Sequence, residues 1–153
     1  MIFGPADERD LDQIMAVEAD SFSPAERWGE QGWRDELRAD DRLVVVGRDA
    51  HERVAAAATF QQVAETADLH RIMVTPDRRG EGVAGRLMGA GLEWAAATGA
   101  DRMLLEVRHD NQGAIALYEK FGFTAISHRR DYYGAGADAV VMQASLTPDV
   151  LEV

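Results

Sequence analysis

The stretch Val74-Thr-Pro-Asp-Arg-Arg-Gly-Glu-Gly-Val-Ala-Gly85 decides the fold. A β-branched run, Leu69–Val74, leads into it, and a helical apolar pattern continues after it as far as Thr98. A strand therefore ends here and a glycine-rich turn opens a helix. The first N–H groups of a helix have no partner inside the helix, and the helix dipole adds positive potential there. From Arg71 to Arg86 the chain has four arginines against two acids, so the turn is a predicted phosphate site.

Outside this segment, the spacing of apolar residues predicts an alternation of strands and helices. The expected strands cover residues 2–3, 43–46, 54–60, 69–74, 102–107, 123–127 and 139–146. The expected helices cover residues 11–22, 31–39, 82–98 and 112–121. Asp10 is the candidate N-cap of the first, and Asn111 or Asp110 that of the last. This order is typical of an α/β fold with an antiparallel meander first and a βαβ crossover in the middle. We expect one domain over residues 1–146 and a tail over residues 147–153.

Composition excludes several classes of function. The chain has 153 residues, no cysteine and a formal net charge of −11. The missing cysteine excludes a disulfide framework, a zinc ribbon and a thiol nucleophile. A negative net charge argues against binding to nucleic acid or to an anionic membrane. The first residues lack a signal-peptide pattern, and no apolar run reaches the length of a membrane span. We therefore expect a cytoplasmic protein, and no metal, since no acidic or histidine set has ligand spacing.

The glycine-rich turn also permits a different interpretation. Gly80, Gly82 and Gly85 spell G-x-G-x-x-G, and Glu106 follows at a strand end, as in the dinucleotide-binding fingerprint. However, the preceding strand ends at Val74, well before the first glycine, and the elements before it form a meander. The chain after Glu106 is also too short for the remaining parallel strands. A glycine-rich turn without any ligand is the remaining alternative.

Four segments carry a resemblance to a known family. Arg79–Ala84 fits the pattern Q/R-x-x-G-x-G/A, and Leu105–Phe123 reads LEVRHDNQGAIALYEKFGF. Both are similar to motifs of the GNAT superfamily of acyl-CoA N-acyltransferases, the first being its pyrophosphate loop. Arg129–Tyr133 resembles the C-terminal signature of the RimI-type ribosomal-protein-alanine N-acetyltransferases, and Phe22–Trp28 resembles their acceptor loop.

The resemblance implies a fold and a co-substrate. The fold is the single-domain α/β GNAT fold, a mixed and mostly antiparallel sheet with helices on both faces, and the co-substrate is acetyl-CoA. The residues that match the family's cofactor site form a strand, the loop after it and one helix cap. They are Ile72, Met73, Val74, Arg79, Gly80, Glu81, Gly82, Val83, Ala84, Gly85 and Asn111. In the family, the backbone of the strand pairs with the pantetheine arm and helps to polarise the thioester carbonyl.

The resemblance also assigns the chemistry. Glu106 matches the general base, which removes a proton from the acceptor amine, and Tyr118 matches the general acid, which protonates the departing thiolate. The sequence alone places Glu106 on the Leu104 face of an apolar strand, which predicts partial burial, although an exposed residue at a strand end remains open. Tyr118 has the helical spacing of a core residue, and a buried ring is compatible with an acid hydroxyl.

The acceptor side is less specific in sequence. Trp28, Tyr132 and Tyr133 are candidate acceptor-binding residues, since aromatic side chains in loops could clamp a peptide N-terminus. His70 lies two residues before Ile72 in the same strand and is a rival base. Ordinary packing of these side chains is the alternative in each case.

The expected activity is transfer of an acetyl group from acetyl-CoA to a protein N-terminus, an N-terminal alanine of a ribosomal protein by resemblance, through direct attack. A GNAT enzyme acting on a small amine is one alternative, and a non-catalytic acyl-CoA sensor is another. Residues 1–41 have 12 acidic residues and four arginines, a balance of −8, which favours a cationic acceptor. We expect a monomer or a weak dimer.

Overall fold

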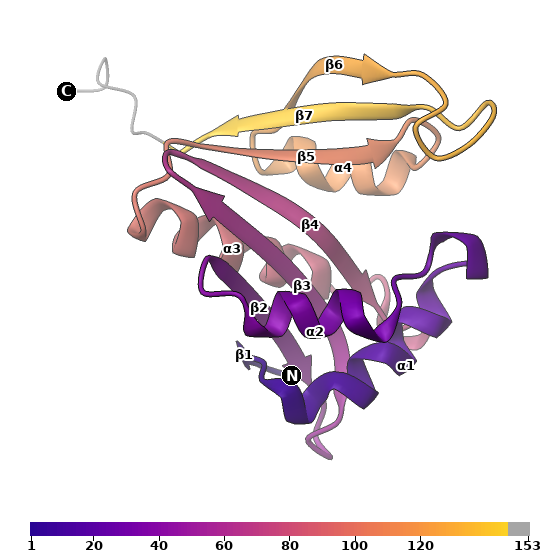
Figure 1. Cartoon of the computed structure of the whole chain (residues 1–153), viewed down its shortest axis with the longest axis vertical. Coiled ribbons are helices and arrows are strands. Elements are labelled where there is room, and N and C mark those ends of the chain that lie inside the picture. Colours follow the sequence, from indigo (N-terminus) through magenta and orange to yellow (C-terminus); the bar gives the residue numbers. More distant parts are fainter. Residues whose placement is uncertain (147–153) are drawn as a thin grey trace. The chain divides into compact units, whose positions relative to one another are not determined.

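The computed structural model describes residues 1–146, and the expected tail at 147–153 lies outside the described residues. Its seven strands form one mixed sheet in the order β1-β2-β3-β4-β5-β7-β6 (Figure 1). The strands are β1 (Ile2–Pro5), β2 (Arg42–Arg48), β3 (Val54–Val63), β4 (Thr66–Val74), β5 (Arg102–Arg108), β6 (Thr124–Arg129) and β7 (Ala139–Ser145). The α-helices are α1 (Leu11–Ser21), α2 (Glu30–Arg38), α3 (Val83–Ala97) and α4 (Gln112–Lys120). There are also short 3₁₀ helices, η1 (Glu8–Asp10), η2 (Pro24–Glu26) and η3 (Pro76–Arg78).

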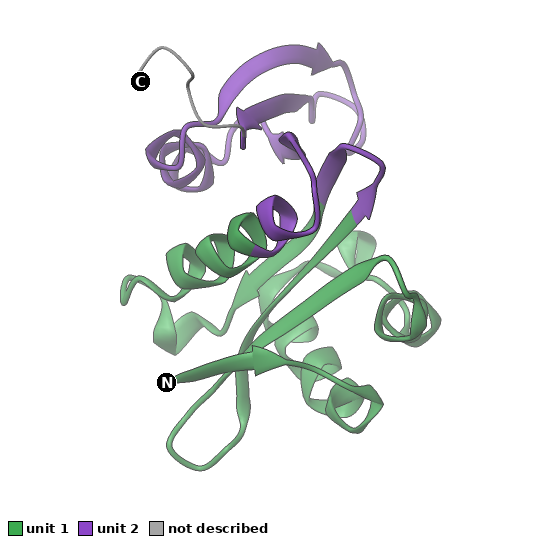
Figure 2. Ribbon diagram, turned by 90° about the vertical axis from the view of Figure 1, so that its left-hand side faces the viewer, with its two compact units in different colours: residues 1–61, 69–93 green, residues 62–68, 94–153 purple. Residues whose placement is uncertain are grey.

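The described chain forms two compact units (Figure 2). Unit 1 comprises residues 1–61 and 69–93, and unit 2 comprises residues 62–68 and those from 94 onward. Strand β4 begins in unit 2, where Thr66, Ala67 and Asp68 pair in parallel with the start of β5, and it continues in unit 1. Helix α3 lies in unit 1 up to Glu93 and ends in unit 2.

Unit 1 buries both faces of its strands. Val46 of β2 and Ala57 of β3 are antiparallel partners that lie in one core with Trp33 of α2 and apolar residues of α1. Side chains alternate between faces along a strand, so Phe60 lies opposite to Ala57. A Cβ atom at Gly91 of α3 would overlap the Phe60 ring, which shows that α3 packs closely on that second face. The expected helices on both faces are thus present in unit 1.

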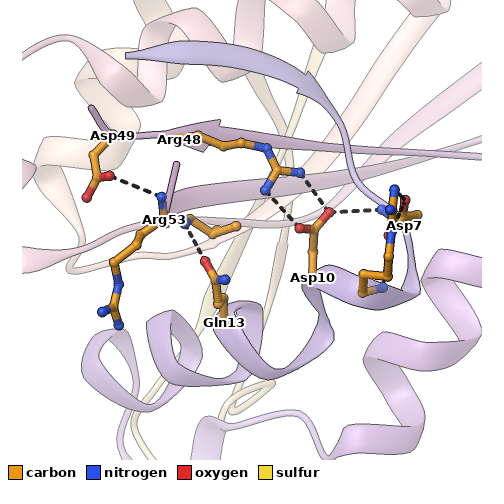
Figure 3. A network of polar contacts seen from close by, with 8 residues as sticks. Asp7, Asp10, Gln13, Arg48, Asp49 and Arg53 are labelled. Carbon is orange, nitrogen blue, oxygen red and sulfur yellow. Dashed lines mark hydrogen bonds and ion pairs between the residues drawn. The ribbon is translucent and has the colours of Figure 1, made fainter. Parts of the chain in front are cut away.

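A polar network fixes α1 to β2 and β3 (Figure 3). Asp10 receives two hydrogen bonds of 2.8 Å from the guanidinium of Arg48, and Gln13 accepts one of 2.7 Å from the Val54 backbone N–H. Asp10 occupies the predicted N-cap position of α1, but its side chain makes no cap bond to that helix. Instead it accepts from the backbone N–H of Asp7, which itself caps η1. The prediction that the Asp10 side chain caps α1 is therefore wrong, because its carboxylate is hydrogen-bonded to Arg48 instead.

Unit 2 is built on β5 and β7. Met103, Leu105 and Val107 are buried on one face of β5. On the other face Leu104, Glu106 and Arg108 are half-buried. Tyr118 of α4 and Phe123 are almost fully buried, with ring centroids 6.0 Å apart. All residues of the edge strand β6 are exposed.

The predicted elements agree with the structure within a few residues, except for the hairpin of β3 and β4. Strand β3 extends to Val63 and β4 begins at Thr66, whereas the expected strands ended at residue 60 and began again at residue 69. The turn is tight, with Ala64 at a φ of 53°. Within residues 1–146, none of the helices combines the length and the apolar character needed to cross a membrane.

Candidate active site

In unit 1, the glycine-rich loop has the geometry of an anion site. After β4, the backbone runs through η3 to Gly80 and Gly82, which have φ values of 81° and 80°. Residues with side chains rarely adopt these values, so both positions require glycine. The first hydrogen bond into α3 runs from the Arg86 N–H to the Gly82 carbonyl at 3.2 Å. The N–H groups of residues 83–85 precede this bond and open the helix, where they can donate to phosphate oxygens.

Three of the four arginines counted between residues 71 and 86 lie near this loop in the sequence and have partners in unit 1. Arg79 donates from Nε to the Val74 carbonyl at 3.1 Å, which ties the loop to the end of β4. The Arg86 guanidinium lies 4.2 Å from the centroid of the Phe3 ring. Arg78 lies 3.9 Å from the carboxylate of Glu81, the residue between the two glycines. Each of these three guanidiniums thus contacts a neighbouring group within the chain.

In unit 2, Glu106 is half-buried, as predicted, but its neighbours are polar. It lies in β5 opposite Val141 of β7, and its side chain is 30% exposed. The carboxylate lies 3.2 Å from Nη1 of Arg129. It also accepts a hydrogen bond from the Tyr132 hydroxyl, and this bond is the main reason why the pKa of Tyr132 is raised. The Arg129 guanidinium lies 5.1 Å from the Tyr132 ring centroid, so the three side chains form one group.

Tyr118 is buried in unit 2, with 5% of its surface exposed. Burial raises the pKa of its phenol from 10.0 to about 12, and Tyr133 adds a smaller electrostatic effect in the same direction. The hydroxyl therefore keeps its proton at neutral pH and can act as a donor. The ring packs on Phe123, so the packing role that the sequence left open is present, and it is compatible with an acid role.

Asn111 caps α4. Its Oδ1 accepts a hydrogen bond of 3.2 Å from the backbone N–H of Ala114. The helix-cap interpretation is thus confirmed, while contact with a cofactor stays a prediction.

The aromatic acceptor candidates lie in separate units. Tyr132 and Tyr133 of unit 2 contact each other edge-on, with centroids 5.1 Å apart. The segment that carries them is held by Asp138, which accepts from the Asp131 N–H at 2.8 Å and lies 2.8 Å from Nε2 of His128. Trp28 belongs to unit 1, and its ring is tilted against that of Trp33, 5.0 Å away.

The Trp28 segment is positioned by two residues that sequence reasoning missed. Glu18 of α1 is 1% exposed and accepts from Nε1 of Trp33 at 2.8 Å and from the Trp28 N–H at 3.1 Å. Arg71 of β4 donates to the same carboxylate and to the Glu26 carbonyl, and it stacks on the rings of Phe22 and Trp28. A signal for Glu18 was available, because it lies seven residues after Leu11, on the apolar face of α1.

His70 also has a partner that the sequence did not suggest. Its Nδ1 lies 2.7 Å from Oε1 of the buried Glu36 in α2. Consecutive residues of a regular strand point to opposite faces, yet His70 and Arg71 both bind carboxylates of the helices α1 and α2. The regular alternation is therefore interrupted between His70 and Arg71.

Residues 9–123 match the family model described as the Acetyltransferase (GNAT) family. The chain belongs to the GNAT acetyltransferase family. It is 38% identical over 105 residues to the ribosomal protein bS18-alanine N-acetyltransferase of Salmonella typhimurium, covering 67% of this chain and 71% of that enzyme. It is 34% identical over 148 residues to an uncharacterized protein of Mycobacterium leprae, but it spans only 40% of the length of that relative. The crystal structure of the ribosomal-protein-S18-alanine N-acetyltransferase from Escherichia coli superposes with a TM-score of 0.88 and 26% identity, covering 99% of this chain and 97% of that one.

Membership of the GNAT family identifies this chain as an acetyltransferase enzyme with acetyl-CoA as its co-substrate. The dinucleotide alternative is wrong for this GNAT protein. A turn of 3₁₀ helix separates its glycines from β4, and most neighbouring strands of its sheet are antiparallel.

Proposed function

We propose that this protein transfers the acetyl group of acetyl-CoA to the α-amino group of a protein N-terminus, and that residues 1–146 form the catalytic domain. The observation that carries the proposal is the pair of groups in unit 2: a half-exposed carboxylate, Glu106, and a buried phenol, Tyr118, that keeps its proton. Amide formation from an amine and a thioester needs one group to accept a proton and one to donate a proton.

The two groups divide the chemistry as follows. The acceptor nitrogen attacks the thioester carbonyl directly, and a C–N bond forms while the C–S bond breaks. Glu106 takes a proton from the attacking nitrogen, and Tyr118 gives its proton to the departing thiolate sulfur. A phenol with a raised pKa donates only over a short hydrogen bond shielded from water, and the burial of Tyr118 provides that shielding.

Unit 1 supplies the binding of acetyl-CoA. The N–H groups of Gly80–Gly85 are assigned to the pyrophosphate, and the backbone of Ile72, Met73 and Val74 is assigned to the pantetheine arm. Glycine at positions 80 and 82 permits the loop to turn its N–H groups outward. Backbone donors suit both tasks because the fold orients them before the substrate arrives.

For the acceptor, we propose the N-terminal alanine of a ribosomal protein. The proposal is supported by the similarity to the Salmonella and E. coli enzymes that carry this activity in their names. The charge of the chain points the same way, because the balance of −8 over residues 1–41 favours a cationic partner. Trp28, Tyr132 and Tyr133 are assigned to the acceptor peptide.

The experiment is a thiol-release assay with acetyl-CoA and a panel of acceptors. We expect release with basic peptides that begin with alanine, and none with the same peptides after their α-amino group is blocked. If polyamines or aminoglycosides react and no peptide does, the proposed acceptor is wrong and the enzyme acts on small amines.

A further inference from the structure

The segment that joins α1 to α2, residues 22–29, carries Trp28, which is assigned to the acceptor peptide. The chain leaves α1 in an extended conformation at Phe22 and passes through the short helix η2 before α2 begins. Irregular connections of this kind depend on side-chain contacts for a fixed shape. A cavity of about 450 Å³ lies beside the segment, and Trp28, Gly29 and Gly32 belong to its lining. The conformation of the segment therefore shapes one wall of this cavity.

Arg71 of β4 contacts the segment at three points. Its guanidinium carbon lies 3.6 Å from the centroid of the Phe22 ring and 4.9 Å from that of the Trp28 ring. At such distances a cation is attracted to the face of an aromatic ring. Its Nη2 also donates a hydrogen bond of 2.6 Å to the Glu26 carbonyl. One guanidinium thus connects the beginning, the middle and the end of the segment to the sheet.

Glu18 of α1 fixes the orientation of this guanidinium. Arg71 donates from Nε to one oxygen of Glu18 at 3.2 Å and from Nη2 to the other. The same two oxygens accept from Trp33 Nε1 and from the Trp28 N–H. The carboxylate is 1% exposed and the Arg71 side chain is 13% exposed, so the ion pair is shielded from water. An arginine suits this position, because the compact ammonium of a lysine cannot make the fork, the carbonyl bond and the stacking together.

The place of Arg71 in the sequence connects the two proposed substrates. It directly precedes Ile72 in β4, the strand assigned to the pantetheine arm, while its side chain contacts the segment that carries Trp28. We propose that Arg71 is a positioning residue for the acceptor, which holds residues 22–29 in the conformation that binds the peptide and thereby lowers the peptide KM. This inference rests on the proposed function and adds to it a determinant of acceptor affinity. A segment that is already ordered loses less conformational entropy when the peptide binds.

Unit 1 offers a matched ion pair at the other end of α1 (Figure 3). Arg48 of β2 donates two hydrogen bonds of 2.8 Å to Asp10, which directly precedes α1. This pair also ties α1 to a strand through a fork of two bonds, but residues 22–29 follow the opposite end of the helix. A change at Arg48 therefore tests the general effect of loosening α1 on the sheet.

The test is steady-state kinetics of Arg71→Lys with a peptide acceptor. Lysine keeps a positive charge opposite Glu18, so we expect the variant to fold, but it loses the fork and the stacking on Phe22. The peptide KM should rise roughly tenfold, while kcat and the KM of acetyl-CoA should stay within about twofold of wild type. Arg48→Lys should leave all three constants unchanged. An unchanged peptide KM in Arg71→Lys, a loss confined to kcat, or an equal rise of KM in Arg48→Lys would overturn the proposal.

Trypsin digestion measures the segment without any acceptor. Trypsin cuts after arginine, and the guanidinium of Arg27 donates to the carbonyls of Phe22 and Ala19 at 2.8 and 2.9 Å. We expect faster cutting after Arg27 in Arg71→Lys than in Arg48→Lys, with both variants folded by circular dichroism, because the segment opens more readily. Equal rates of cutting at this bond would contradict the proposal.

A double variant keeps the proposal testable if Arg71→Lys is unstable. Glu18→Gln combined with Arg71→Met leaves no unpaired charge in place of the buried ion pair, and its peptide KM should again rise roughly tenfold. A wild-type KM in this folded variant would overturn the proposal. If wild type itself acetylates no peptide, the proposed function fails. If wild type acetylates peptides and the Arg71 variants keep its KM, this inference alone fails.

Discussion

The carboxylate of Glu106 lies 3.2 Å from the guanidinium of Arg129. The same carboxylate accepts a hydrogen bond from the Tyr132 hydroxyl. Arg129 is the last residue of β6, and Tyr132 lies in the segment that follows this strand. The proposed base thus has a cationic partner within its own unit. An acceptor ammonium that approaches Glu106 must compete with this guanidinium.

Arg129→Gln removes the competitor, and we expect the KM of a peptide acceptor to fall. Both side chains are partly exposed, so the pair contributes modestly and the decrease should be about two- to fivefold. Arg130→Gln, at the exposed neighbouring position, is the matched control and should leave KM unchanged. An increase of KM in Arg129→Gln alone would mean that the guanidinium helps to hold the acceptor.

Glu106→Gln removes the proposed base while keeping the size of the side chain. General-base groups contribute roughly 10²- to 10⁴-fold, and we expect a loss of kcat in this range. The melting temperature should change little, since the pair with Arg129 is partly exposed. Steady-state kinetics with a peptide acceptor measure the effect, and near-wild-type turnover would remove the assignment.

Tyr118→Phe keeps the packing on Phe123 and removes the proton donor. We expect kcat to fall by roughly 10²-fold or more with little change in peptide KM. Because the folded pKa of Tyr118, about 12, exceeds its ordinary value of 10.0, burial of the protonated phenol stabilises the fold fully only below pH 10. This contribution is lost as the pH rises from 10 to 12. Wild type should therefore lose melting temperature over this interval faster than Tyr118→Phe does.

Gly91→Ala tests the packing of α3 on the sheet. The added Cβ would overlap the Phe60 ring, and we expect a loss of about 1–3 kcal/mol in the free energy of unfolding. Gly89→Ala is the matched control, because a Cβ at position 89 meets no atom within 4 Å. Alanine at a free helix position stabilises by up to about 1 kcal/mol. Urea unfolding of both variants measures the difference, and equal stabilities would contradict the close contact.

The parts of the site that could be predicted from sequence are local. Glycine spacing predicted the turn before α3, because a positive φ at Gly80 and Gly82 is a property of single residues. The cap at Asn111 could be predicted because it is also local: its Oδ1 accepts a hydrogen bond from the backbone N–H of Ala114, only three residues further along the chain. Secondary structure could be located within a few residues wherever apolar spacing was regular.

The parts that could not be predicted depend on partners far apart in the chain. Glu36 and His70 are 34 residues apart, and their contact depends on how α2 packs on β4. The spacing of apolar residues did not predict that the alternation of side chains is interrupted between His70 and Arg71. Arg129 could be recognised in the sequence as part of a motif. Its ion pair with Glu106 could not be predicted, because it depends on the pairing of β5, β7 and β6.

The most direct measurement is mass spectrometry of a ribosomal protein with an N-terminal alanine after incubation with the enzyme and acetyl-CoA. We predict one added acetyl group, located by fragmentation on the α-nitrogen of the alanine and absent with Glu106→Gln. An unmodified N-terminus under conditions in which the enzyme acetylates lysine side chains or small amines would contradict the account.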